Sequence, residues 1–213
     1  MNVKADRASA TRESILVTAE RLFAEDGVHA VSNRHISEAA GQGNNAAVNY
    51  HFGTKVDLVR AIVRKHTGPM ERIRAELVEA IDGDGDLRDW VACLVRPSTT
   101  YLQQLGAPTW FARFSAQVLT DPVLRAIIVE ESLSSPALAR AVDGLYRCLD
   151  GLPADVRAER GDMARQLMIH MTAERERALA EGTETPRANW DDAGTGLVDA
   201  ITGLLLAPVT PAA

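Results

Sequence analysis

The segment at residues 31–52 constrains the fold of this chain more than any other part of the sequence. Ser32 is a favourable N-cap residue, because its hydroxyl can accept a hydrogen bond from a free amide in the first turn of a helix. Val31 before it and Ile36 after it are placed to pack together across that helix start. A short helix is therefore predicted to begin at Ser32 and to end near Gly41, where glycine permits a tight turn toward a second helix.

A second short helix is predicted after the turn, over residues 44–51. At 100° per residue, Val48 and Phe52 fall on one side of this helix, which can face the core. The opposite side carries small and hydrogen-bonding side chains: Ala46, Asn49 and Tyr50. Small residues let a helix approach closely, amides can pair with base edges, and a phenol can reach phosphate. Two short helices with such an outer face are typical of a DNA-binding helix-turn-helix.

Residues 10–66 as a whole resemble the N-terminal domain of the TetR family of transcriptional regulators. The resemblance is carried by three groups of residues: Ile15, Leu16, Ala19, Leu22, Phe23 and Gly27; Ile36, Ala39, Ala40 and Gly41; and Tyr50, His51, Phe52, Gly53, Thr54, Lys55 and Leu58. It implies a repressor that binds a palindromic operator in double-stranded DNA as a homodimer. It also implies that the last two long helices form the dimer interface and that a small-molecule effector releases the DNA.

The candidate base contacts lie on the outer side of the second short helix and in the turn before it. They are Gln42, Asn44, Asn45, Ala46, Asn49 and Tyr50. Asparagine can pair bidentately with adenine, and the alanine methyl can meet the thymine methyl. Helix capping is a second interpretation of Asn44 and Asn45, because asparagine before an apolar run is a good cap.

The candidate phosphate contacts come from two arguments. The resemblance implies that Tyr50, His51 and Lys55 contact phosphate. Arg34 is added because it stands near the start of the first short helix, although an exposed cation there can equally be a solvated side chain.

An all-α fold is predicted for the chain, because aromatic residues make up only 5% of it and no run of alternating β-branched residues occurs. The predicted domains are a DNA-binding domain at residues 1–67 and an effector-binding and dimerisation domain at residues 68–213, divided where Gly68 and Pro69 interrupt the helical pattern. The remaining predicted helices are 11–25, 55–66, 70–81, 87–96, 98–105, 109–119, 122–131, 136–150, 153–181 and 191–206.

The charge is distributed unevenly along the chain. The net charge is −6, but residues 1–66 hold nine Lys and Arg against seven Asp and Glu, with four histidines, while residues 67–213 carry a charge of −8. Phosphate attraction is screened within about 8–10 Å, so a distant acidic domain need not prevent DNA binding. Non-specific affinity is expected to be modest.

The second predicted domain offers candidates for an effector pocket. They are Tyr101, Trp110, Phe111, Phe114, Gln117 and His170, with Arg113 as a further polar group. Aromatic side chains at helical spacing are also ordinary core residues, and this second interpretation has at least equal weight.

No catalytic, cofactor or metal motif stands out. No Gly-x-Ser-x-Gly, His-Glu-x-x-His or phosphate-cradling glycine loop occurs, so an enzyme is not expected. His170 and Glu174 stand four residues apart, but two residues do not make a metal site. The acidic run 82–86 resembles a calcium loop, yet Leu87 and Cys93 occupy the positions that require glycine and glutamate.

A location in the cytoplasm is expected, since no apolar stretch approaches the roughly 18 residues that span a bilayer. Cys93 and Cys148 are expected to be reduced and buried. An alternative function is a helical small-molecule-binding or protein-interaction module that no longer reads DNA. It is favoured by the low positive charge and by one residue more between Gly41 and His51 than in the family pattern.

Overall fold

The computed structural model describes residues 3–44, 46–81, 84–133 and 135–210, and these residues form an all-α fold. The helices are α1 (Val3–Asp26), α2 (Asn33–Ala39), α3 (Ala47–Phe52), α4 (Lys55–Glu79), α5 (Leu87–Leu105), α6 (Phe111–Thr120), α7 (Pro122–Leu133), α8 (Pro136–Cys148), α9 (Ala154–Ala180) and α10 (Trp190–Leu206). Among the described helices, none is long and apolar enough to cross a membrane.

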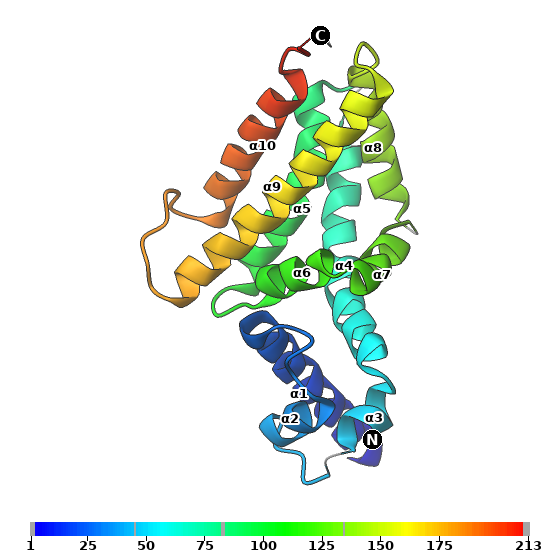
Figure 1. The fold of residues 1–213 in the computed structure, drawn as a ribbon, viewed down its shortest axis with the longest axis vertical. Coiled ribbons are helices and arrows are strands. Elements are labelled where there is room, and N and C mark those ends of the chain that lie inside the picture. The colour runs from blue at the N-terminus through cyan, green and yellow to red at the C-terminus, as the bar shows by residue number, and fades with distance from the viewer. Residues whose placement is uncertain (1–2, 45, 82–83, 134, 211–213) are drawn as a thin grey trace. The chain divides into compact units, whose positions relative to one another are not determined.

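The chain divides into two compact units, whose members can be followed in Figure 1. The first comprises Met1–Thr67 and Trp110–Glu131, and the second comprises Gly68–Thr109 and Ser132–Ala213. The first boundary thus falls where Gly68 is expected to divide the domains, but Trp110–Glu131 groups with the first unit and not with the second. The functions predicted for the two domains stay predictions.

Aromatic stacking explains why Trp110–Glu131 belongs to the first unit. Phe114 is fully buried and stacks on Phe23 of α1 with ring centroids 6.3 Å apart. Phe111 stacks on the buried His66 imidazole with ring centroids 4.1 Å apart. These contacts attach α6 to α1 and to α4 and bury the two aromatic rings. The sequence alone does not show which helix each ring packs against.

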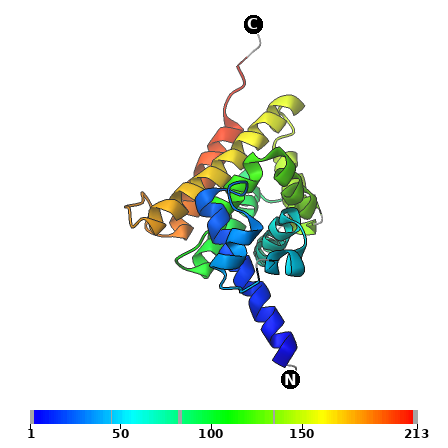
Figure 2. The same cartoon turned by 60° about the horizontal axis from the view of Figure 1, so that its bottom comes forward.

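Helix α1 begins eight residues before the predicted start at residue 11. The side chains of residues 7–10 are exposed, so no apolar periodicity marks these turns in the sequence. Figure 2 shows the N-terminal turns of α1 extending beyond the other helices of the first unit. From Ile15 onward the predicted inner face is buried: Ile15, Leu16, Ala19, Leu22 and Phe23.

Two helices continue through a proline that was predicted to interrupt them. Helix α4 contains Pro69 and α5 contains Pro97, so the predictions of separate helices on either side of each proline are wrong. Proline normally costs a helix the hydrogen bond to the carbonyl four residues earlier. For Pro97 that carbonyl is Cys93 O, which accepts a hydrogen bond from Arg74 Nε at 3.3 Å. A side chain distant in sequence therefore compensates the proline.

The second unit is organised around α5, which packs against α8 and α10, while α10 also lies alongside α9 (Figure 1). Its core includes Val78, Trp90, Val91, Val95, Ala141, Leu145, Leu197, Val198, Ile201 and Leu205. Gly144 of α8 lies so close to the Trp90 ring that a Cβ there would be 2.3 Å from it. Glycine at this position permits the close approach of α5 and α8.

Candidate nucleic-acid interface

The predicted helix-turn-helix is present, and its first helix begins where predicted. The Ser32 hydroxyl caps α2 by accepting a hydrogen bond from His35 N at 3.1 Å. Gly41 adopts a φ of +68°, a left-handed conformation that glycine allows without strain. The turn leads to α3, whose Val48 amide is 3.4 Å from the buried Ser37 hydroxyl oxygen of α2. The two short helices are thus joined by a buried hydrogen bond.

Helix α3 begins at Ala47, three residues after the predicted start. Asn44 explains the difference, because its Oδ1 accepts a hydrogen bond from Ala46 N at 2.9 Å and its backbone carbonyl accepts one from Ala47 N at 3.0 Å. These bonds form an Asx turn in place of the first helical turn. The N-cap of α3 is Ala46, which makes no side-chain cap hydrogen bond, so Asn44 does not cap the helix as considered above. Its base contact stays a prediction.

The outer face of α3 has the composition that the sequence predicts. Ala46, Asn49 and Tyr50 are exposed, whereas Ala47 and Val48 are buried. Tyr50 is 83% exposed, and its ring meets the His51 imidazole edge to face with centroids 5.0 Å apart. This face offers an amide, a phenol and an imidazole next to small residues, which suits hydrogen bonding to base edges and phosphates.

Gln42 and Asn45 are the remaining predicted base contacts. Gln42 is half-buried, and its Nε2 donates to the Ala40 carbonyl at 3.0 Å, so part of its amide supports the turn. Asn45 lies outside the described residues.

The predicted phosphate contacts differ in how their charge is balanced. Arg34 is exposed, but its Nε donates to Glu38 Oε1 at 2.8 Å, and this bond raises the pKa of Arg34. Glu38 thereby offsets part of the charge that Arg34 would offer to a phosphate. His51 is half-buried at the C-terminal end of α3.

Lys55 has a structural contact that the sequence does not reveal. Its Nζ donates to the carbonyl oxygens of Val28 at 3.0 Å and Val31 at 2.6 Å. Partial burial lowers the pKa of the Lys55 ammonium. An ammonium has three N–H donors, so one remains beyond the two that hold the segment before α2.

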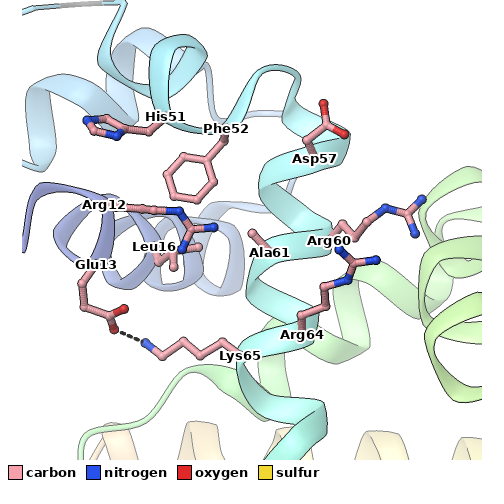
Figure 3. A pocket seen from close by; sticks show the side chains of 10 residues that line it. All are labelled: Arg12, Glu13, Leu16, His51, Phe52, Asp57, Arg60, Ala61, Arg64 and Lys65. Carbon is pink, nitrogen blue, oxygen red and sulfur yellow. Dashed lines mark hydrogen bonds and ion pairs between the residues drawn. The ribbon is translucent and has the colours of Figure 1, made fainter. Parts of the chain in front are cut away.

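A groove lies beside the C-terminal end of α3, between α1 and the first turns of α4 (Figure 3). Its volume is about 520 Å³, and its lining comprises Arg12, Glu13, Leu16, His51, Phe52, Asp57, Arg60, Ala61, Arg64 and Lys65. The Arg12 guanidinium lies over the Phe52 ring, 4.6 Å from its centroid. Arg12 adds a cation on the same side as His51, and no sequence motif had singled it out.

The remaining cations of the groove are balanced by carboxylates. Lys65 Nζ is 2.6 Å from Glu13 Oε1. Arg60 and Arg64 both pair with Glu131, at 3.2 Å and 3.0 Å, and the pKa of Glu131 is lowered chiefly by its hydrogen bond with Arg64. Because these cations are paired with carboxylates, the groove is not expected to have a strong positive potential. Arg12, which stacks on Phe52, is the cation of the groove best suited to contact a phosphate.

The predicted effector-pocket residues do not lie in one unit. Trp110, Phe111, Phe114 and Gln117 belong to the first unit, where Phe111 and Phe114 are core residues, whereas Tyr101 and His170 belong to the second. Gln117 and His170 are exposed, and the groove of Figure 3 includes none of the six. Their role in binding an effector stays a prediction.

In the described part of the chain, no group of three or more His, Cys, Asp or Glu side chains could hold a metal ion. Glu174 instead pairs with Arg177 at 2.9 Å. Cys93 is buried as predicted, but Cys148 is exposed, so that prediction is wrong. Cys148 ends α8, where the backbone turns at the surface.

Comparison with known proteins places the site in a recognised domain. Residues 15–62 match the model of the bacterial regulatory proteins of the tetR family. The HTH-type transcriptional repressor AcnR of Corynebacterium glutamicum is 32% identical over 126 residues, and AcnR of Corynebacterium efficiens is 30% identical over 126 residues. Each match covers 57% of this chain and 57% of the relative's length.

A solved structure extends the similarity to the whole fold. The TetR-family regulator PfmR from Thermus thermophilus superposes with a TM-score of 0.52, over 92% of this chain and 96% of that one. The two sequences are 18% identical, so this likeness concerns the fold alone.

Proposed function

We propose that this chain is a sequence-specific DNA-binding transcriptional repressor of the TetR family, whose family model matches residues 15–62. The observation that carries the proposal is the outer face of α3, where Ala46, Asn49 and Tyr50 are exposed. Val48, on the opposite side of the helix, is buried in the core. A helix of this kind can enter the major groove with its side chains directed at base edges.

The proposed contacts divide into two classes. Base contacts are assigned to Gln42, Asn44, Asn45, Ala46, Asn49 and Tyr50. Phosphate contacts are assigned to Arg34, Tyr50, His51 and Lys55, with Arg12 beside His51 as an addition from the geometry. Base contacts specify sequence, whereas phosphate contacts position the protein and make its affinity depend on salt.

A homodimer on a palindromic operator is part of the proposal, with α9 and α10 as the interface. The exposed side of α10 supports it, because Ala200 and Gly203 are small and a Cβ at Gly203 would meet no atom within 4 Å. Small residues let a second helix approach closely. Two-fold symmetry would then space the half-sites by about one helical turn, roughly 34–36 Å, or somewhat more.

Release of the DNA by a small molecule is proposed from family membership. The candidate contacts are Tyr101, Trp110, Phe111, Phe114, Gln117 and His170. An effector can act only if it binds the DNA-incompetent conformation more tightly than the competent one. A bacterial regulator of this kind would work in the cytoplasm, where the chromosome lies.

The test is selection from random duplex DNA at two salt concentrations, followed by sequencing of the bound fraction. The wild-type protein is expected to enrich a palindromic consensus, and Asn49→Ala to relax the preference at one position in each half-site. Arg140→Ala, which truncates an exposed side chain of α8, serves as the control and should keep the consensus. Absence of enrichment at either salt concentration would instead favour a helical binding module that does not read DNA.

A further inference from the structure

Asn33 and Asn49 connect the two helices of the helix-turn-helix on its exposed side. The Asn33 Nδ2 group donates a hydrogen bond to Asn49 Oδ1 at 2.7 Å. Asn33 is the first residue of α2 and is half-buried, whereas Asn49 is exposed on the outer face of α3. The half-buried Asn33 side chain therefore restrains the exposed Asn49 side chain.

The position of Asn33 is itself fixed by the contact between the two helices. Its backbone carbonyl accepts a hydrogen bond from the Ser37 hydroxyl at 3.0 Å, and the same hydroxyl oxygen lies 3.4 Å from Val48 N. Its side-chain Oδ1 is buried and has no hydrogen-bond partner among the described residues. The amide of Asn33 thus interacts through its nitrogen alone, and that nitrogen faces Asn49.

This arrangement restricts what Asn49 can offer to a base. A free asparagine amide presents one acceptor oxygen and one NH₂ donor group, and bidentate pairing with adenine uses both. In this protein Asn33 occupies one acceptor site of the Asn49 oxygen, which favours the NH₂ group as the part of the amide that meets a base. Asn49 therefore resembles a hydrogen-bond donor more than a bidentate amide.

We propose that Asn33 is a positioning residue that sets Asn49 as a hydrogen-bond donor, and that Asn49 consequently selects a base with major-groove acceptors. Guanine is the best match, because its edge presents N7 and O6, and thymine presents O4. Cytosine presents only the N4 donor and is excluded. The inference rests on the proposed DNA-binding function, and it extends that function by naming the chemistry that one position of the operator must have.

Reversal of the hydrogen bond tests the proposal. In Asn33→Asp the new carboxylate can only accept, so Asn49 must turn its NH₂ group inward and its Oδ1 outward. An acidic residue is also compatible with the first turn of a helix. Selection from random duplex DNA should then move the preference at one position of each half-site from guanine or thymine to cytosine, by roughly fivefold or more. Adenine offers both the N7 acceptor and the N6 donor and does not distinguish the two orientations.

Two further variants show whether Asn33 acts through Asn49. Asn33→Ala removes the donor and should broaden the preference at the same position without reversing it. In the Asn49→Ala background, Asn33→Asp should leave the consensus unchanged. A changed consensus in that background would mean that residue 33 contacts the DNA itself, and it would overturn the proposal.

The outcomes separate this inference from the function on which it rests. A wild-type palindromic consensus that persists unaltered in Asn33→Asp and Asn33→Ala overturns the inference alone. Absence of a wild-type consensus overturns both. If added negative charge prevents Asn33→Asp from binding any sequence, the result for Asn33→Ala decides: a broadened preference supports the inference, and an unchanged one overturns it.

Discussion

Lys55 Nζ donates a hydrogen bond to the Val31 carbonyl oxygen at 2.6 Å, and through this bond the start of α4 holds the segment that precedes α2. The same ammonium also binds the Val28 carbonyl. Lys55, for which the family resemblance implies a phosphate contact, therefore supports the structure of the helix-turn-helix.

Lys55→Ala is expected to affect both stability and DNA binding. Loss of hydrogen bonds from a charged donor to half-buried carbonyls should lower the free energy of unfolding by roughly 1–3 kcal/mol. If the third N–H contacts phosphate, the slope of log K against log salt should also become shallower by about 0.9. Urea denaturation and DNA binding at several salt concentrations measure the two effects.

Lys65→Ala provides the control for Lys55, because Lys65 pairs with the exposed carboxylate of Glu13 and not with backbone carbonyls (Figure 3). It should change stability little. An unchanged salt slope in Lys55→Ala, together with reduced stability, would assign Lys55 to structural support alone.

Glu131→Gln tests the carboxylate that joins Arg60 and Arg64. The hydrogen bond with Arg64 is the main cause that lowers the pKa of Glu131 below its ordinary value of 4.5. The ion pairs therefore contribute fully above pH 4.5, and the contribution is lost as the pH falls through the lower folded-state pKa. The variant should be less stable than wild type at pH 7, and the two melting temperatures should converge as the pH falls below 4.5 and through the lower folded-state pKa of Glu131. A gap that persists at low pH would contradict the assignment.

Gly144→Ala is expected to destabilise the second unit. The added Cβ would lie 2.3 Å from the Trp90 ring, which has to move together with the core around it. Overpacking of this kind costs roughly 1–3 kcal/mol. Gly161→Ala on α9 is the matched control: its Cβ meets nothing within 4 Å, so better helix propensity should raise stability by up to about 1 kcal/mol. Equal effects in urea denaturation would refute the packing argument.

Ala200→Glu tests the proposed dimer through α10. A two-fold interface brings each substituted residue toward its symmetry mate, so one substitution introduces two carboxylates. Dimer dissociation should become at least about tenfold easier, as measured by light scattering across a concentration series. Ala139→Glu, at an exposed position of α8, should leave the dimer intact. Wild-type behaviour of both variants would place the interface elsewhere.

Local signals in the sequence were sufficient for part of this structure. Ser32 predicted the start of α2, and helical periodicity predicted that Val48 is buried while Asn49 and Tyr50 are exposed. The predicted start of α3 was wrong because Asn44 accepts hydrogen bonds from the amides of Ala46 and Ala47 in a turn. A local turn of this kind competes with a helix for the same backbone groups, and the sequence does not show which of the two forms.

Contacts between residues distant in sequence could not be predicted from such local signals. Phe111 and Phe114 were considered for a pocket, but their stacking partners, His66 and Phe23, are 45 and 91 residues away. The donor relation between Asn33 and Asn49 likewise depends on how α2 and α3 meet. Periodicity gives the face on which a side chain lies, but not the group that it meets.

The compensation of Pro97 by Arg74 has a consequence for how this protein can vary in evolution. Arg74 Nε satisfies the Cys93 carbonyl that Pro97 leaves without its helical partner, so the loss of Arg74 while Pro97 is present removes the donor to that carbonyl. With alanine at position 97, the carbonyl recovers a backbone donor and the arginine becomes dispensable for it. Mutational paths that lose the arginine first should therefore be disfavoured, and the two positions should change together among descendants of this sequence.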